Sequence, residues 1–394
     1  MLIQHYLDYL ANIQTAIFKF LDDDENSQHN FSHLIELLDN QRIRENPPEF
    51  RLFMHLLSKI ANNRHRKTNF FNRIFQILDH FRTEITQTYS NYELFNLFKK
   101  SKQILLFFIK ENMLIIDQQI YDKIKLIKYR NKFYLHYFYP EVKKFLDAQT
   151  LKKMKELKTI DEDNFEEKRN KGENESYVCE LIRKDSLQKF VECLAIGNMT
   201  YDTKIKKSIF ETNYFLANTE TTLLEYAVSC GSIHISIYLL SKAKSFSNYF
   251  WFYLIHGNNA KILHLVESKN CFPTEKIFES CFIEAIKCHH VELFKYLSNT
   301  YLKNNVEFQN RLILNIFHFY NFGLIEKEFV GQSYLHLMCF CDYCSLVKLA
   351  TETMDLDLNS KIIFKNNFFY EISIYFFGFI EFQNFIFLIK FVID

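Results

Sequence analysis

The stretch Thr222–Leu240, TLLEYAVSCGSIHISIYLL, contains the clearest structural signal in the chain. Thr222 is a residue type that caps helix N-termini, and Ala227 is small enough to let two antiparallel helices approach closely. Gly231 can adopt the positive φ that a tight turn requires. The stretch therefore predicts two short helices joined by a tight turn. One such pair cannot bury both of its faces, so Leu239 and Leu240 are expected to pack against a neighbouring pair.

Similar segments occur on both sides of this stretch. Ala285 precedes His289 by four residues, as Ala227 precedes Gly231, and an apolar segment follows each of them. Two-helix repeats have a period of about 33 residues. The predicted turns are scattered around that period, at residues 185, 231, 257, 289 and 342. The longest interval leaves room for a degenerate unit around residues 322–323.

The stretch Thr222–Leu240 resembles the ankyrin pattern T-P-L-H-x-A-x-x-x-G-H-x-E-I-V-x-L-L, with Leu223 in the Pro position and Glu225 in the His position. Ser333–Met338 has the same offsets as the start of this pattern, and His290–Leu297 resembles its second helix.

The order of features resembles one group more closely. A helical N-terminal region, the segments Tyr177–Asp185 and Ser208–Asn213, and then ankyrin units are similar to the expanded ankyrin-domain families of trichomonad protists. The resemblance spans about residues 1–350. It implies a protein that interacts with other proteins through ankyrin repeats, with no established biochemical role and no catalytic residues. We expect no cofactor.

We therefore expect an all-α protein, a helical solenoid of ankyrin-type helix pairs preceded by an all-helical N-terminal region. The expected divisions are a helical domain over 1–150, a charged linker over 151–175, and a repeat region over 176–394 with a degenerate C-terminal end. The linker assignment depends on charge, because fifteen of its 25 residues are Lys, Arg, Asp or Glu. Such a segment has too few apolar residues to form a core.

Composition excludes several classes of protein. Among 394 residues there are only 7 Gly, and the closest two, Gly323 and Gly331, are too far apart for a P-loop, a dinucleotide-binding turn or a nucleophile elbow. Lys and Arg number 48 against 47 Asp and Glu, and this balance argues against a nucleic-acid-binding protein. We expect no enzymatic activity and a protein partner.

The N-terminal residues 1–21 lack the basic region of a secretory signal, and nine cysteines are an odd number for a disulfide framework. Both features predict a cytoplasmic location. The apolar run 362–393 is interrupted by charges such as Glu381, so we expect no membrane span. A diverged repeat, a capping element and a membrane-associated tail all remain open for this run.

Two groups of Cys and His are candidate chemical sites. Cys339, Cys341 and Cys344, with His336 upstream, suggest an alternative function as a metal- or thiol-dependent protein. Zinc usually takes four ligands from two paired knuckles, and a second Cys-x-x-Cys is missing, so we expect core thiols and no metal. The second group is expected to form hydrogen bonds at an inter-helix turn and not to supply a nucleophile; it consists of Cys281, Cys288, His289 and His290.

The loops between helix pairs are the expected contact surface. Their candidate protein-binding residues are Glu220, Lys244, Asn248, Lys269, Asn304, Asp355, Asp357 and Asn359. For Trp251, within Phe250–Tyr253, core packing and a role as an interface anchor are both considered. The basic segment Asn62–Lys67 is interpreted as a solvated loop, with a contact to RNA or anionic lipid as the alternative.

Overall fold

The computed structural model describes residues 2–64, 69–128, 132–155, 164–301 and 306–354. Within these ranges the chain forms α-helices and short 3-10 helices and no β-strand, apart from one bridge between Lys204 and Thr222. The expected all-α class is therefore confirmed. The described residues group into two compact units, one within 1–56 and 305–394 and the other within 57–304.

The first unit combines the beginning of the chain with its last described helices. Its elements are α1 (Leu2–Asp22), α2 (Ser27–Asn40), η1 (Ile43–Glu45), the start of α3 (Pro47–Asn63), α22 (Val306–His318), η4 (Phe322–Leu324), η5 (Lys327–Phe329), η6 (Gln332–Tyr334), α23 (Leu335–Phe340) and α24 (Cys344–Thr353). Helix α1 packs against α2, η4 and α24. The buried Gln14 side chain donates a 3.0 Å hydrogen bond to Asn321, and this bond joins segments 307 residues apart.

The second unit begins with shorter helices that follow α3. They are α4 (Phe70–His80), α5 (Arg82–Thr88), α6 (Asn91–Phe98), α7 (Lys102–Lys110), α8 (Gln118–Lys128), α9 (Lys132–Tyr137), α10 (Tyr139–Val142), η2 (Lys143–Phe145), α11 (Ala148–Lys155) and α12 (Phe165–Lys171). Among them, α7 contacts α4 and α6, and α6 also contacts α8. Ser90 and Glu93 form a reciprocal capping box at the start of α6.

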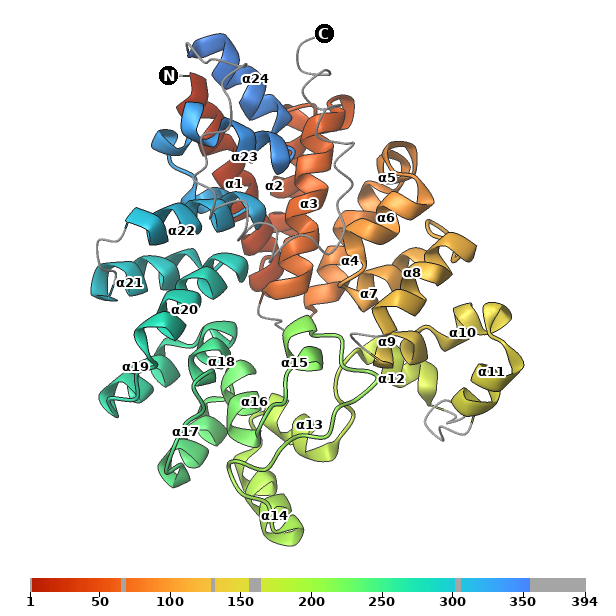
Figure 1. Ribbon diagram of the computed structural model, residues 1–394, viewed down its shortest axis with the longest axis vertical. Coiled ribbons are helices and arrows are strands. Elements are labelled where there is room, and N and C mark those ends of the chain that lie inside the picture. The colour runs from red at the N-terminus through yellow and green to blue at the C-terminus, as the bar shows by residue number, and fades with distance from the viewer. Residues whose placement is uncertain (1, 65–68, 129–131, 156–163, 302–305, 355–394) are drawn as a thin grey trace. The chain divides into compact units, whose positions relative to one another are not determined.

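The rest of the second unit consists of helix pairs, which Figure 1 shows following one another in the green and teal part of the ribbon. The helices are α13 (Tyr177–Arg183), α14 (Leu187–Gly197), α15 (Tyr214–Asn218), α16 (Leu223–Ser229), α17 (Ile233–Lys242), α18 (Phe250–Gly257), α19 (Ala260–Ser268), α20 (Glu275–Lys287) and α21 (Val291–Tyr301). The first helix of each pair contacts the first helix of the neighbouring pair: α16 lies against α13 and α18, and α18 lies against α20. The second helices of neighbouring pairs also contact one another, since α17 lies against α14 and α19.

A left-handed residue separates the two helices of each of these pairs. The residues with positive φ are Asp185, Gly231, Asn258 and His289. In the first unit, Asp342 occupies the same place between α23 and α24. The positions match the predicted turns, apart from a shift of one residue from 257 to 258.

The hydrogen bonds at these turns are also alike. At four of these five turns, the residue after the turn donates from its backbone N–H to the carbonyl five residues earlier, as from Ser232 to Ala227 and from His290 to Ala285, both at 3.0 Å. This bond belongs to the Schellman motif, which satisfies free carbonyls at a helix C-terminus. At the fifth, Asn258 itself donates to the carbonyls of Leu254 and Ile255. The predicted cap also forms, because Thr222 and Glu225 make a reciprocal capping box at the start of α16.

The predicted linker 151–175 lies inside the second unit, and its residues 164–175 are described in full. They include α12, where Phe165 and Arg169 are buried. Arg169 Nη1 donates to both carboxylate oxygens of Glu141, at 2.9 and 2.8 Å, and to the carbonyl of Tyr137 at 3.2 Å. High charge density in this segment therefore coexists with a buried ion pair.

Candidate functional site

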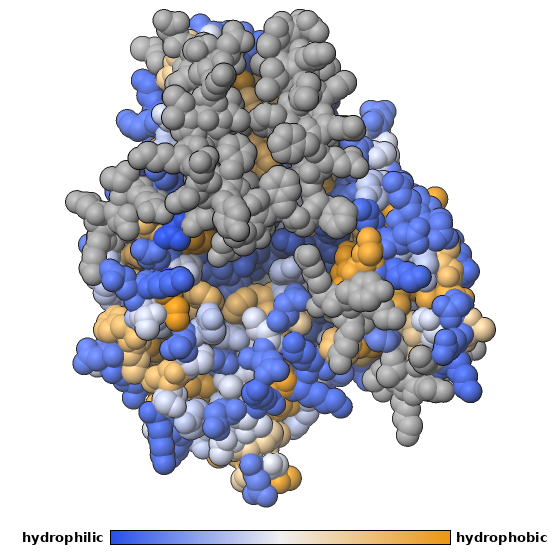
Figure 2. All heavy atoms as spheres, viewed as in Figure 1, coloured by the Kyte–Doolittle hydropathy of each residue, from blue (hydrophilic) through white to orange (hydrophobic). Residues whose placement is uncertain are grey.

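The loops that follow α17 and α19 are surface features of the second unit. Three of the predicted contact residues lie in them and are exposed, namely Lys244, Asn248 and Lys269. Two further aromatic residues, Tyr249 and Phe272, lie in the same loops, and the sequence analysis did not single them out. Their side chains are 60% and 46% exposed. On the face drawn in Figure 2, hydrophobic and hydrophilic residues are interspersed over the described surface.

The other predicted contact residues are less informative. Glu220 is exposed, and its carboxylate forms an ion pair with Lys204 across the loop that precedes α16. The remaining four lie outside the described residues; they are Asn304, Asp355, Asp357 and Asn359.

Trp251 belongs to the core. Its side chain is fully buried, and its indole Nε1 donates a hydrogen bond of 2.6 Å to the carbonyl of Cys271. The ring meets Phe278 edge to face at 5.4 Å. The core interpretation is therefore confirmed, and Trp251 offers no surface to a partner.

The predicted cysteine cluster has the properties of buried thiols. Cys341 is buried, and Cys339 and Cys344 are half-buried. Burial raises the pKa of Cys339 to about 11, and burial together with Asp342 raises the pKa of Cys344 to about 12. Thiols with such pKa values are protonated at neutral pH and react slowly. The side chain of His336 lies outside what the structure describes.

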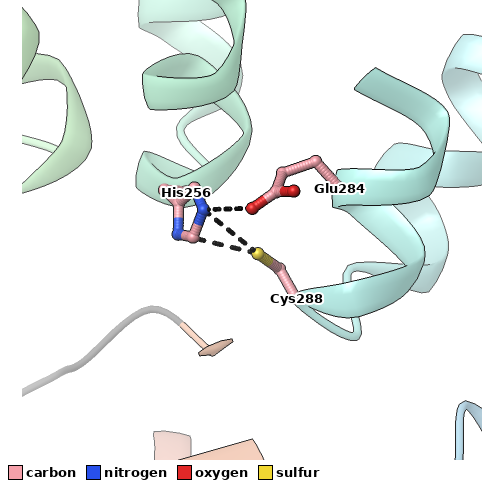
Figure 3. A group of neighbouring side chains, drawn as sticks. All are labelled: His256, Glu284 and Cys288. Atoms are coloured by element: carbon pink, nitrogen blue, oxygen red, sulfur yellow. Dashed lines mark hydrogen bonds and ion pairs between the residues drawn. The ribbon is translucent and has the colours of Figure 1, made fainter. Parts of the chain in front are cut away.

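A different group of ligand-type side chains meets inside the second unit, between the ends of α18 and α20 (Figure 3). His256 Nε2 lies 2.6 Å from Glu284 Oε1, and Cys288 Sγ lies 3.6 Å from His256 Nδ1 and 3.8 Å from Nε2. The ligand atoms of all three residues lie within 4.8 Å of one another. Among the residues described, this is the one set of three or more His, Cys, Asp or Glu side chains that meets this distance.

Neighbouring side chains fix this cluster in place. The ring of Phe215, from α15, stacks on the His256 ring with centroids 4.0 Å apart and planes 10° apart. The Lys287 ammonium lies 2.7 Å from the same Glu284 oxygen that His256 contacts. His256 and Cys288 are buried, whereas the Lys287 side chain remains 22% exposed.

The charges in the cluster follow from burial and from these contacts. Burial lowers the pKa of His256, although Glu284 acts in the opposite direction. Burial alone would raise the pKa of Glu284, but Lys287 and His256 outweigh it and hold that pKa at about 2. Burial and the Glu284 carboxylate raise the pKa of Cys288 well above the usual value of a thiol. At neutral pH the cluster therefore contains a carboxylate, an ammonium, a neutral imidazole and a thiol.

This arrangement does not activate the cysteine as a nucleophile. An activated thiol needs an imidazole nitrogen in line with it and a lowered pKa. Here the sulfur is almost equally distant from both nitrogens of His256, and the pKa of Cys288 is raised. The sequence pointed to Cys288 as part of a turn cluster with His289 and His290, but it missed His256 and Glu284.

The segment Asn62–Lys67 is described only as far as Arg64. All three of its described residues are buried, and Arg64 Nη1 donates to the carbonyl of His289 at 3.1 Å. This part of the segment is therefore not the solvated loop that its composition predicted.

No protein-family model, no curated protein and no solved structure matches the chain. Among the described helices, none combines the length and the apolar character that a membrane crossing requires. The apolar run 362–393 lies outside the described residues.

Proposed function

We propose that this chain is a non-enzymatic scaffold for protein–protein interaction, built as a solenoid of ankyrin-type helix pairs. One observation supports the proposal above all others. Four successive helix pairs of the second unit have a left-handed residue at the same place between their helices, at Asp185, Gly231, Asn258 and His289. Ankyrin-type pairs need such a turn because their two helices are antiparallel and closely spaced.

Contacts between neighbouring pairs also support a stacked array. The Ser232 hydroxyl, at the turn of one pair, donates a 2.5 Å hydrogen bond to the carbonyl of Ile182 in the preceding pair. A Cβ added at Gly257 would lie 2.0 Å from the carbonyl oxygen of Val228, so α18 and α16 approach closely there. In a solenoid each repeat is stabilised mainly by its neighbours, and both of these contacts join neighbouring pairs.

The loops after α17 and α19 are the proposed binding surface. Tyr249 and Phe272 expose aromatic rings there, beside the exposed Lys244 and Lys269. Aromatic residues contribute a large share of binding energy at many protein interfaces. These four residues are called the loop surface below.

A proximity-labelling experiment with the full-length chain in its native cells tests the proposal. A partner found this way is then measured against a variant that combines Tyr249→Ala and Phe272→Ala. We expect this variant to bind at least about tenfold more weakly, as the loss of interface anchors does. The matched control combines Ile115→Ala and Leu126→Ala, which also remove exposed apolar side chains (66% and 51% exposed) but lie in the predicted N-terminal helical region.

Equal binding by both double variants would contradict the loop surface as the binding site. Failure of full-length protein to retain any specific partner after labelling would contradict the scaffold function itself. Circular dichroism of both variants establishes that a loss of binding does not come from unfolding.

A further inference from the structure

The cluster of His256, Glu284 and Cys288 contains three kinds of side chain that proteins use to hold zinc. Imidazole nitrogen, carboxylate oxygen and cysteine sulfur are all zinc ligands, and three protein ligands with one exchangeable position make a recognised type of zinc site. We propose that these three residues bind a divalent transition-metal ion, with Zn²⁺ the best match. The proposal is independent of the scaffold function.

One donor distance is near that of a tetrahedral site, and another must lengthen. With a Zn–N distance of about 2.0 Å and a Zn–S distance of about 2.3 Å, two tetrahedral ligands lie about 3.5 Å apart. Cys288 Sγ lies 3.8 Å from His256 Nε2, close to that separation, but 3.6 Å from Nδ1, so the sulfur must also shift toward the Nε2 side of the ring to share an ion bound there. Nε2 also lies 2.6 Å from Glu284 Oε1, so these two atoms must move apart by less than an ångström, roughly, to admit the ion.

The fold fixes the positions of the three ligand side chains. Glu284 and Cys288 are four residues apart at the end of α20, so both face the same side of that helix. Phe215 stacks on the imidazole and fixes the plane of the His256 ring. Nε2 is the nitrogen that faces the carboxylate, so it is the nitrogen assigned to the metal, and Nδ1 then carries the imidazole proton.

The charge balance assigns a role to Lys287. Its ammonium lies 2.7 Å from Glu284 Oε1 and balances the buried carboxylate when no metal is bound. A divalent ion together with the Glu284 carboxylate and the Cys288 thiolate has no net charge. The ion therefore takes over from the Lys287 ammonium in balancing the carboxylate. The Lys287 side chain is 22% exposed and can turn toward solvent, and the thiol proton of Cys288 leaves to water as the Cys288–metal bond forms.

Cobalt(II) titration of the metal-free full-length chain, under reducing conditions, tests the site. Cobalt bound to a thiolate gives a charge-transfer absorption that cobalt bound to nitrogen and oxygen alone does not give. We expect one equivalent of this absorption, and we expect zinc to displace it. Cys288→Ser removes it, whereas the matched control Cys281→Ser keeps it, because Cys281 is a buried thiol on the same helix outside the cluster.

Lys287→Met gives a second test, in which cobalt binding should become tighter and not weaker. Because it removes the cation that competes for Glu284, we expect it to bind cobalt more tightly than the wild-type chain, whereas Glu284→Gln weakens binding at least about tenfold. Absence of the absorption in the wild-type chain overturns the proposal, and so does an unchanged absorption in Cys288→Ser. If Cys288→Ser does not fold, Lys287→Met decides: tighter binding supports the site, and equal or weaker binding overturns it.

Discussion

The Asp185 carboxylate lies at the N-terminus of α17, where it accepts a 2.9 Å hydrogen bond from the backbone N–H of Ile235. Its other oxygen accepts from the backbone N–H of His234 at 3.0 Å. Asp185 is itself the turn residue of the preceding pair, with φ of 48°. One residue therefore ends the first helix of one pair and caps the second helix of the next.

Loss of this cap should weaken the array. We expect Asp185→Ala to lower the free energy of unfolding by about 1–2 kcal/mol, since helix caps contribute that much, and Ala also tolerates a positive φ poorly. Asp185→Asn should lose less, because Asn adopts positive φ readily and keeps one acceptor oxygen. Chemical denaturation followed by circular dichroism measures both. Equal stability of Asp185→Ala and the wild-type chain would show that this contact does not couple the two pairs.

The close approach of α18 to α16 makes a second prediction. A Cβ at Gly257 would lie 2.0 Å from the backbone carbonyl oxygen of Val228, which cannot move without shifting α16. We expect Gly257→Ala to destabilise the chain by about 1–3 kcal/mol or more, as overpacking does. Gly331→Ala is the matched control, because a Cβ there meets nothing within 4 Å. It should change the melting temperature little.

A third prediction separates packing residues from surface residues. Leu240 is 1% exposed on α17, so Leu240→Ala should lower the free energy of unfolding by about 2–5 kcal/mol. Lys244 is exposed four residues later, and Lys244→Ala should leave that free energy unchanged within about 0.5 kcal/mol. Denaturant titration of the two variants, together with partner binding, distinguishes them. A large loss of stability in Lys244→Ala would remove Lys244 from the loop surface.

The local features of the fold could be predicted from sequence because neighbouring residues determine them. Thr222 was expected to cap a helix, and it does so in a capping box with Glu225, three residues later. The turn at Gly231 likewise depends on one residue and its neighbours. The association of Gln14 with Asn321, 307 residues away, could not be predicted in the same way. Periodicity shows that a helix has a buried face but does not identify what covers it.

The candidate site illustrates the same limit. Glu284 and Cys288 share one helix, and their spacing of four residues is visible in the sequence. His256 joins them from α18, 28 residues before Glu284, and no local pattern links the two helices. Tyr249 and Phe272 were missed for a different reason. In a chain with 43 Phe and 23 Tyr, composition does not distinguish an exposed ring from a core ring.

The fourth prediction concerns the cysteine cluster near the end of the described chain. Burial raises the pKa of Cys339 and of Cys344, Cys341 is buried, and the three lack a second pair of cysteines. We therefore expect Cys341→Ser to leave the metal content of purified protein unchanged, as measured by elemental analysis. A loss of about one zinc per chain on this substitution would instead support the metal- or thiol-dependent alternative.

The last prediction concerns Arg169, which is 3% exposed although it lies in the most highly charged part of the sequence. Removing one partner of a buried ion pair leaves an uncompensated charge, so Arg169→Ala should cost about 3–5 kcal/mol of stability. Glu141→Ala should also destabilise, and the double variant should lose less than the two single losses combined, because neither charge is then left alone. Denaturation of all four proteins gives the coupling energy. Strict additivity would mean that the contact between Arg169 and Glu141 contributes nothing to the stability of the fold.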